Sequence, residues 1–132
     1  MKTILLCEDD PDMVRLIQVV VERAGYALKV VPDGQQAIVA GLKESPDLVL
    51  MDLRMPRLDG VAAIRALRKG GYTRPIVALT AADTPEDRER VREAGGTAFI
   101  LKTLVMSDVA AAIERLIGEP EAFKVPESFG KP

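Results

Sequence analysis

The chain has 132 residues, of which 18 are lysine or arginine, 20 are aspartate or glutamate and none is histidine. This length suits one domain of ordinary size, and a net charge of −2 provides no global basic field for nucleic-acid binding. Without histidine, the chain can build neither a Ser-His-Asp or Cys-His nucleophile system nor a zinc site with imidazole ligands. Its single cysteine, Cys7, cannot form an internal disulfide and suits a reducing compartment.

Short runs typical of β-strands alternate with helical patterns along the whole chain. Strands are predicted over residues 3–7, 26–31, 48–51, 76–80 and 98–101. The helices between and after them are predicted to begin at Asp10-Pro11, Asp33-Gly34, Asp59-Gly60, Thr84-Pro85 and Ser107-Asp108. Gly25, Gly70 and Gly95 are the predicted helix ends. The apolar faces of the first two helices are predicted to carry Met13, Leu16, Ile17, Val20, Val21, Ala37, Ile38, Gly41 and Leu42.

This alternation, with three strands that are almost wholly apolar, predicts an α/β fold. A doubly wound parallel sheet of five strands would be covered by helices on both faces. We expect this domain to span residues 1–117, and the prolines of residues 118–132 to mark a C-terminal tail or linker. No apolar run is long enough for a membrane span or a signal peptide, so we expect a soluble, cytoplasmic protein.

Polar side chains stand where the predicted strands end. Glu8 and Asp9 follow the first strand, Asp52 ends the third, Thr80 ends the fourth and Lys102 follows the fifth. Parallel strands end at one edge of a sheet, and ligands of open α/β sheets bind there. One polar residue at a strand end would mean little, but the combination predicts a functional site.

The charges of these residues indicate which chemistry the site could perform. Glu8, Asp9 and Asp52 would repel one another at close range unless a cation lay between them, and hard oxygen ligands favour Mg²⁺. Lys102 and Thr80 would receive an incoming anion. Asp52 lies centrally and is therefore the best nucleophile for phosphoryl transfer to an aspartate.

The neighbouring Asp10 has a simpler explanation than metal binding. It precedes Pro11, and an aspartate followed by proline is a strong helix start. Glu8 and Asp9 have no such structural duty, although on their own they could form an ordinary solvated acidic turn.

From residue 2 to about residue 117, the sequence resembles the receiver domains of bacterial two-component response regulators. The matching motifs occur in order along the chain: residues 4–11 with the acidic triplet, residues 47–52, Met55-Pro56 with Asp59-Gly60, residues 75–81, and Lys102. Each motif alone is weak evidence, whereas the ordered set is strong. The resemblance implies a flavodoxin-like fold with strand order 2-1-3-4-5.

The resemblance also implies roles for the residues at the strand ends. Asp52 matches the acceptor of a phosphoryl group that comes from a partner histidine kinase or histidine phosphotransfer protein. Asp9 would contact Mg²⁺ directly and Glu8 directly or through water. The backbone carbonyl of Arg54 would be a further metal ligand, and Lys102 matches the lysine of the site.

Two residues match the positions that switch such domains between states. Thr80 matches the hydroxyl that moves toward the phosphoryl group, and Phe99 matches the aromatic residue that turns inward. A phenylalanine in a strand is otherwise usually a core residue. The switch would change the face of the fourth helix, fifth strand and fifth helix, which would control an output partner or domain. The resemblance also allows a homodimer on phosphorylation, and it implies neither direct nucleic-acid nor membrane binding by this domain.

The sequence departs from the family pattern beside the site. Thr103 stands where the family commonly has proline after its lysine, so we expect a trans peptide bond and a different course for the following loop. Arg54 and Ala82 occupy positions that tune the lifetime of the phosphoryl group in this family. Our hypothesis is that Arg54 overhangs the site and alters the access of hydrolytic water.

Three other functions fit these residues less well than a phosphorylated receiver domain. A pseudo-receiver, an interaction module that is never phosphorylated, is the main alternative, and the complete residue set argues against it. An aspartyl phosphatase would need a second aspartate where Arg54 stands. A flavin or nucleotide site would need a glycine-rich first loop, which is acidic here. We therefore expect a phosphorylation switch that takes part in its own phosphorylation and is not an independent enzyme.

Overall fold

The structure is a computed structural model that describes residues 1–55, 58–102 and 105–118. Its strands are β1 (Thr3–Cys7), β2 (Ala27–Val31), β3 (Leu48–Asp52), β4 (Ile76–Thr80) and β5 (Ala98–Leu101). Its helices are α1 (Pro11–Arg23), α2 (Gly34–Glu44), α3 (Gly60–Lys69), α4 (Pro85–Ala94) and α5 (Val105–Ile117). Strands and helices alternate strictly, as predicted.

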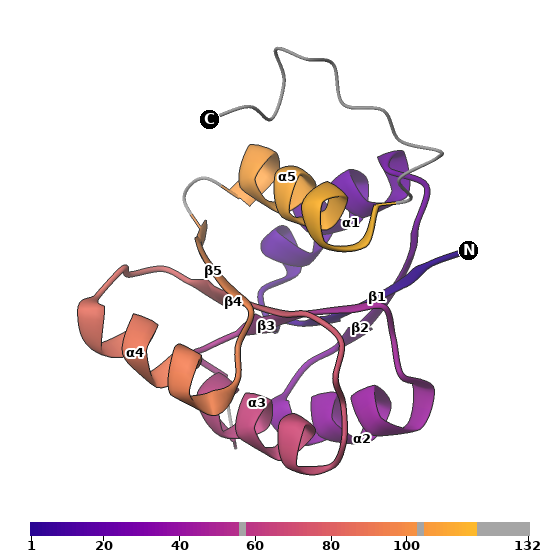
Figure 1. The fold of residues 1–132 in the computed structure, drawn as a ribbon. Coiled ribbons are helices and arrows are strands. Elements are labelled where there is room, and N and C mark those ends of the chain that lie inside the picture. Colours follow the sequence, from indigo (N-terminus) through magenta and orange to yellow (C-terminus); the bar gives the residue numbers. More distant parts are fainter. Residues whose placement is uncertain (56–57, 103–104, 119–132) are drawn as a thin grey trace.

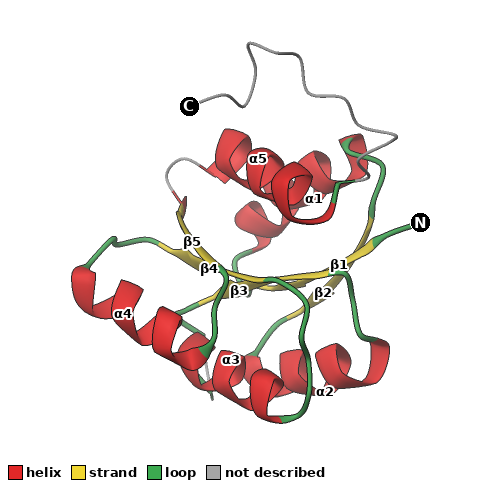
Figure 2. Ribbon diagram, in the orientation of Figure 1, coloured by secondary structure: helices red, strands yellow, loops and turns green. Residues whose placement is uncertain are grey.

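The strands form one parallel sheet in the order β2-β1-β3-β4-β5. In its register, Ile4 of β1 lies beside Leu28 of β2 on one side and Leu48 of β3 on the other. Helices α1 and α5 cover one face, and α2, α3 and α4 cover the other (Figures 1 and 2). The predicted doubly wound α/β fold with strand order 2-1-3-4-5 is thereby confirmed.

The sheet separates two hydrophobic cores, because successive side chains of a strand point to opposite faces. From β1, Leu5 and Cys7 pack under α2 and α3, whereas Ile4 and Leu6 pack under α1 and α5. The central strands β3 and β4 are buried along their whole length. These strands form a rigid base from which the polar residues at their ends project.

Side-chain caps begin helices α1, α2, α3 and α4 where the sequence predicted them. The Oδ1 atom of Asp10 accepts a hydrogen bond from the backbone N–H of Asp12 at 3.0 Å. Asp33, Asp59 and Thr84 cap α2, α3 and α4 in the same way. Each cap satisfies an N–H group that the first helical turn leaves unpaired. Asp10 is therefore accounted for as a cap.

Glycines stand at the ends of three helices, as predicted. Gly25 lies two residues beyond α1 with φ 88°, and Gly95 follows α4 with φ 106°. Such positive φ angles are strained for other residues, which explains glycine at both positions. Gly70 caps α3 in an ordinary right-handed conformation.

The structure corrects three expectations of local structure. Helix α5 begins at Val105 rather than at Ser107-Asp108. Ser107 and Asp108 instead lie inside the helix. Leu16 of α1 and Leu42 of α2 are exposed rather than buried. Both lie at the borders of apolar faces that are narrower than the sequence pattern suggested.

Several predictions concern residues outside the described ranges: Pro56 of the Met55-Pro56 motif, the course of the chain at Thr103, and the tail up to residue 132. The boundary between the domain and its tail thus stays a prediction. Among the described helices, none has the length and apolar character needed to span a membrane.

Candidate functional site

The polar residues that end the strands gather at the carboxyl edge of the sheet. Glu8 and Asp9 follow β1, and Asp52 is the last residue of the adjacent strand β3. Thr80 ends β4, and Lys102 follows β5. The parallel topology brings residues from the ends of four strands to the same edge, as the pattern predicted.

Lys102 joins the two buried carboxylates of this site. Its Nζ atom lies 2.9 Å from Oε1 of Glu8 and 3.1 Å from Oδ2 of Asp52. Burial alone would lower the pKa of Lys102. The hydrogen bond to Glu8 and the negative charge of Asp52 outweigh this effect and hold the pKa of Lys102 above its ordinary value. Lys102 is therefore a fixed positive charge beside Asp52.

The other oxygen of Asp52 is held by the backbone. The N–H of Arg54 donates a hydrogen bond to Oδ1 of Asp52 at 3.1 Å. The Asp52 side chain is only 4% exposed, so its carboxylate is oriented by one charged and one backbone donor. Such fixed donors around a nearly buried carboxylate are typical of an oriented nucleophile.

Glu8 is the most buried acidic group of the site. The N–H of Asp10 donates to its Oε2 atom at 3.2 Å. Its Oε1 atom is buried and accepts no well-aligned hydrogen bond from the described part of the chain, although the Lys102 ammonium is close. Burial, and next the charge of Asp52 against the opposing effect of Lys102, raise the pKa of Glu8 to about 7. Glu8 is therefore protonated more readily than an exposed glutamate.

Glu8, Asp9 and Asp52 could together hold a metal ion. Each offers a carboxylate oxygen, and these oxygens lie within 4.8 Å of one another. The buried Oε1 of Glu8 accepts no well-aligned hydrogen bond from the described residues, so it remains available to a metal ion beside its contact with Lys102. The all-oxygen donor set suits a hard divalent ion such as Mg²⁺. The residues present therefore fit the predicted metal, and the carbonyl of Arg54 stays a prediction.

The hydroxyl of Thr80 is turned toward its own loop. Thr80 is fully buried, and its Oγ1 atom donates to the carbonyl of Ala82 at 3.0 Å. The N–H of Ala82 donates back to Oγ1 at 3.3 Å. The structure thus brings Thr80 to the edge of the site on the strand next to Asp52, with its hydroxyl engaged in a tight local turn.

Phe99 lies on β5, one strand farther from Asp52. It is partly buried against the core under α2, α3 and α4, so core packing explains some of its burial. The Arg88 guanidinium of α4 also covers its ring, with Cζ 4.8 Å from the ring centroid. This contact could not be predicted from the sequence, because it joins α4 and β5, which have no fixed spacing along the chain.

A polar cleft of about 480 Å³ adjoins the site at Asp9. Arg54 lines it from the loop after β3, and Arg90 lines it from α4. Arg90 lies 3.3 Å from Asp87 and 3.9 Å from Asp59, so its charge is largely paired. Arg54 is exposed at the rim of this cleft, and its overhanging position stays a prediction. The position of Arg90 beside the site could not be predicted from the sequence, because its contact with Asp59 joins α4 to the start of α3.

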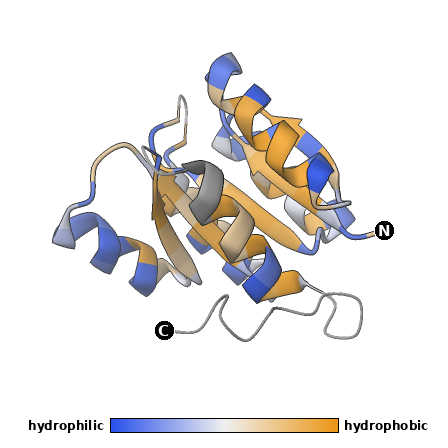
Figure 3. Ribbon diagram, turned by 90° about the horizontal axis from the view of Figure 1, so that it is seen from above, coloured by the Kyte–Doolittle hydropathy of each residue, from blue (hydrophilic) through white to orange (hydrophobic). Residues whose placement is uncertain are grey.

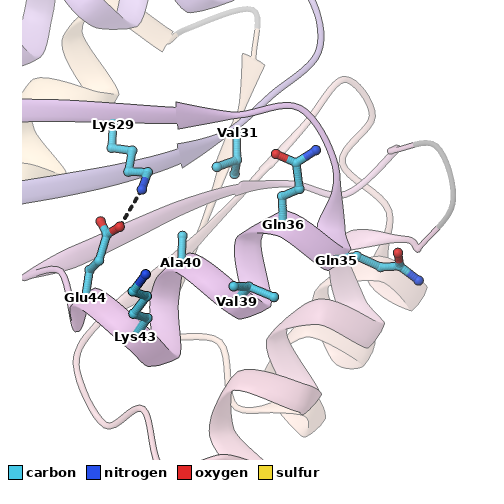
Figure 4. Close-up of a pocket in the computed structure, with 8 residues that line it drawn as sticks. All are labelled: Lys29, Val31, Gln35, Gln36, Val39, Ala40, Lys43 and Glu44. Atoms are coloured by element: carbon cyan, nitrogen blue, oxygen red, sulfur yellow. Dashed lines mark hydrogen bonds and ion pairs between the residues drawn. The ribbon is translucent and has the colours of Figure 1, made fainter.

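Two other features lie apart from this chemistry. Burial, and next the charge of Asp52, raise the pKa of the Cys7 thiol to about 12, so the thiol stays protonated and serves packing. A hollow of about 410 Å³ lies between β2 and α2, where Lys29 and Glu44 form an ion pair and Val39 is exposed (Figure 4). It contains none of the residues at the strand ends.

Comparisons with known sequences agree with the geometry. Residues 4–114 match the family model of the response regulator receiver domain. The alkaline phosphatase synthesis transcriptional regulatory protein PhoP of Bacillus subtilis is 32% identical over 120 residues, covering 91% of this chain and 50% of that protein. The transcriptional regulatory protein ResD of Bacillus subtilis is 34% identical over 114 residues, covering 86% of this chain and 47% of that protein. The chain spans about half the length of these curated relatives.

Solved structures give the same result at the level of the fold. The receiver domain of the sensor histidine kinase PA1611 of Pseudomonas aeruginosa has a TM-score of 0.81 and 35% identity, covering 89% of this chain and 98% of that one. That domain holds a magnesium ion in its active site cleft. The BeF3-activated receiver domain of RstA from Klebsiella pneumoniae has a TM-score of 0.82 and 32% identity, covering 89% of this chain and all of that one.

Proposed function

The chain belongs to the response regulator receiver domain family, and from that premise we propose that Asp52 accepts a phosphoryl group from a partner's phosphohistidine. The observation that carries this proposal is the nearly buried Asp52 carboxylate, 3.1 Å from the Lys102 ammonium and beside two further carboxylates. The chain contains no histidine, so the donor is a histidine kinase or a histidine phosphotransfer protein.

In the proposed transfer, an oxygen of Asp52 forms a bond to phosphorus while the bond from phosphorus to the partner's imidazole nitrogen breaks. The imidazole, which carries a proton on its other nitrogen, takes the electron pair of that bond and leaves as neutral imidazole. Lys102 already contacts Asp52, and its ammonium can neutralise negative charge on the phosphoryl oxygens. The N–H of Arg54 keeps the carboxylate oriented during attack.

Glu8, Asp9 and Asp52 would hold Mg²⁺, with the carbonyl of Arg54 as a further ligand. The bound ion supplies charge neutralisation for the transferring phosphoryl group. Glu8 and Asp9 are therefore expected to act by holding this positive charge, because both lie too near Asp52 to remain ionised together without cost.

Thr80 and Phe99 are the proposed switch. A phosphoryl group on Asp52 offers acceptor oxygens to the Thr80 hydroxyl, which would exchange its bond to the Ala82 carbonyl for one to phosphate. Movement of the loop after β4 would then alter the packing around Phe99. This change would present a different α4–β5–α5 face to an output partner or domain.

Arg54 is proposed to tune the lifetime of the phosphoryl group. Its side chain is exposed at the rim of the cleft that adjoins Asp9, and from there it would limit how hydrolytic water approaches. Arg54→Ala should change the rate of dephosphorylation, measured as decay of the phosphorylated mass. The exposed Arg65→Ala on α3 is the matched control. An unchanged rate in Arg54→Ala would remove this role.

Incubation with Mg²⁺ and acetyl phosphate, followed by intact-mass measurement, tests the proposed function. The wild type should gain the mass of one acid-labile phosphoryl group, and Asp52→Asn should gain none. Removal of Mg²⁺ with a chelator should prevent the gain. If the wild type gains no mass with several donors and binds no Mg²⁺, the chain is instead an interaction module of the pseudo-receiver kind.

A further inference from the structure

A chain of contacts links the loop after β4 to the Phe99 ring. Arg88, on the exposed side of α4, donates from Nε to Oδ1 of Asp83 at 2.5 Å and from Nη2 to Oδ2 at 2.9 Å. The same guanidinium lies over Phe99, with Cζ 4.8 Å from the ring centroid. One arginine thus joins three segments: the loop after β4, helix α4 and strand β5.

The loop end of this chain is next to the proposed switch hydroxyl. Asp83 directly follows Ala82, whose carbonyl accepts the hydrogen bond of Thr80. If the Thr80 hydroxyl turns toward Asp52, it must release Ala82, and the backbone that carries Asp83 is then free to move. The pair between Asp83 and Arg88 holds that backbone in its present position.

Helix α4 offers little other attachment near its start. It is the most hydrophilic helix of the domain (Figure 3), and its buried residues, Val91 and Ala94, lie in its second half. The contacts of Arg88 with Asp83 and Phe99 are therefore main contacts that attach the first half of α4 to the rest of the domain. Loss of these Arg88 contacts is expected to move the first turns of α4 and the Phe99 ring together.

We propose that Arg88 is a positioning residue: paired with Asp83 and stacked on Phe99, it holds the ring and the β4–α4 loop in the conformation described here. It thereby opposes the rearrangement that phosphorylation favours. This inference rests on the proposed function of Asp52 and adds a lock that the Thr80 and Phe99 switch must overcome. Both contacts are partly exposed, so each is of the modest strength usual for surface cation–π and ion-pair contacts.

Binding of beryllofluoride, a phosphoryl mimic, in the presence of Mg²⁺ measures how easily the lock opens. Asp83→Asn breaks the ion pair, and Arg88→Met removes the cation but keeps an aliphatic stem over the ring. Each should lower the beryllofluoride concentration for half-saturation by roughly two- to fivefold. Arg88→Lys, which keeps the charge but loses the planar fork, should lie between wild type and Arg88→Met.

Two readouts separate a lock from a merely structural role. Mg²⁺ affinity without beryllofluoride should stay unchanged in these variants, because Arg88 and Asp83 contact none of the carboxylates that would hold the ion. Glu89→Gln is the matched control, since it breaks the exposed pair between Glu89 and Arg92 on the same helix without touching an aromatic ring. Its half-saturation point should equal that of the wild type.

The position of the Phe99 ring tests the lock without any ligand. Fluorophenylalanine labelling gives one NMR resonance for each of the three phenylalanines, and Phe99→Leu assigns the one from Phe99. In Asp83→Asn this resonance should move toward its beryllofluoride-bound position. If it stays in place and the half-saturation point is unchanged, the lock is overturned. A wild type that binds no beryllofluoride would instead refute the proposed function. A difference between the unliganded Phe99 resonances of Asp83→Asn and wild type would then still show that the pair of Asp83 and Arg88 holds the ring, and identical resonances would show that it does not.

Discussion

Glu8 should make the metal-free domain less stable as the pH rises. Burial and the charge of Asp52 raise its pKa from 4.5 to about 7, so the folded protein holds this proton more tightly than the unfolded chain. The stability linked to that proton is fully present below the unfolded pKa and is lost as the pH rises through about 7. A shift of this size corresponds to about 3 kcal/mol in the free energy of unfolding.

Glu8→Gln isolates this contribution, because glutamine keeps the shape and the acceptor for the N–H of Asp10 but does not titrate. In a chelator, its stability relative to wild type should rise by about 3 kcal/mol between about pH 4 and pH 8. Urea unfolding followed by circular dichroism measures this difference. Exposed Glu22→Gln on α1, away from the site, is the control. A Glu8→Gln difference that is equal at both pH values would refute the reasoning.

Three further outcomes are expected. Mg²⁺ affinity of the wild type, measured by titration calorimetry, should fall by up to about tenfold per pH unit below the raised pKa of Glu8, because protons compete with the metal; affinity independent of pH would contradict this. Gly60→Ala should lower the free energy of unfolding by about 1–3 kcal/mol and weaken Mg²⁺ binding, because the added Cβ would lie 2.3 Å from the Asp52 carbonyl oxygen. Chemical unfolding and calorimetry measure these two effects, and wild-type values in both would show that the backbone at Gly60 shifts without cost. Arg68→Met should lower the free energy of unfolding by about 2 kcal/mol, because Arg68 donates hydrogen bonds to three backbone carbonyls. The control Arg65→Met, at an exposed position, should change the free energy of unfolding little. Equal losses in the two variants would argue against a stabilising role of the Arg68 hydrogen bonds.

The fold could be predicted because its signals are local and repeated. Apolar strands, helix caps such as Asp10 and terminal glycines such as Gly95 each depend on a few neighbouring residues. The parallel topology then follows from the alternation of strands and helices. The prediction that α5 starts at Ser107-Asp108 was wrong, because residues of these types are common in a first helical turn as well as at a cap.

The proximity of the site residues could also be predicted, because strand ends meet at one edge of a parallel sheet. The exact partners could not. That Lys102 contacts both Glu8 and Asp52, and that the Thr80 hydroxyl is bound to Ala82, depends on side-chain rotamers that no spacing encodes. The contact of Arg88 with Phe99 is of the same kind, since it arises from the packing of α4 on β5.

The most direct test of the account is to locate the phosphoryl group among the clustered carboxylates. Borohydride reduction of the acyl phosphate after incubation with Mg²⁺ and acetyl phosphate, followed by peptide mass spectrometry, identifies the modified side chain. Asp52 should be the residue reduced, because it ends the central strand β3, between the strands that lead to Glu8 and Thr80, and its carboxylate is oriented by the N–H of Arg54 and the ammonium of Lys102. A label on Glu8 or Asp9, or an unlabelled Asp52 in phosphorylated protein, would contradict the account.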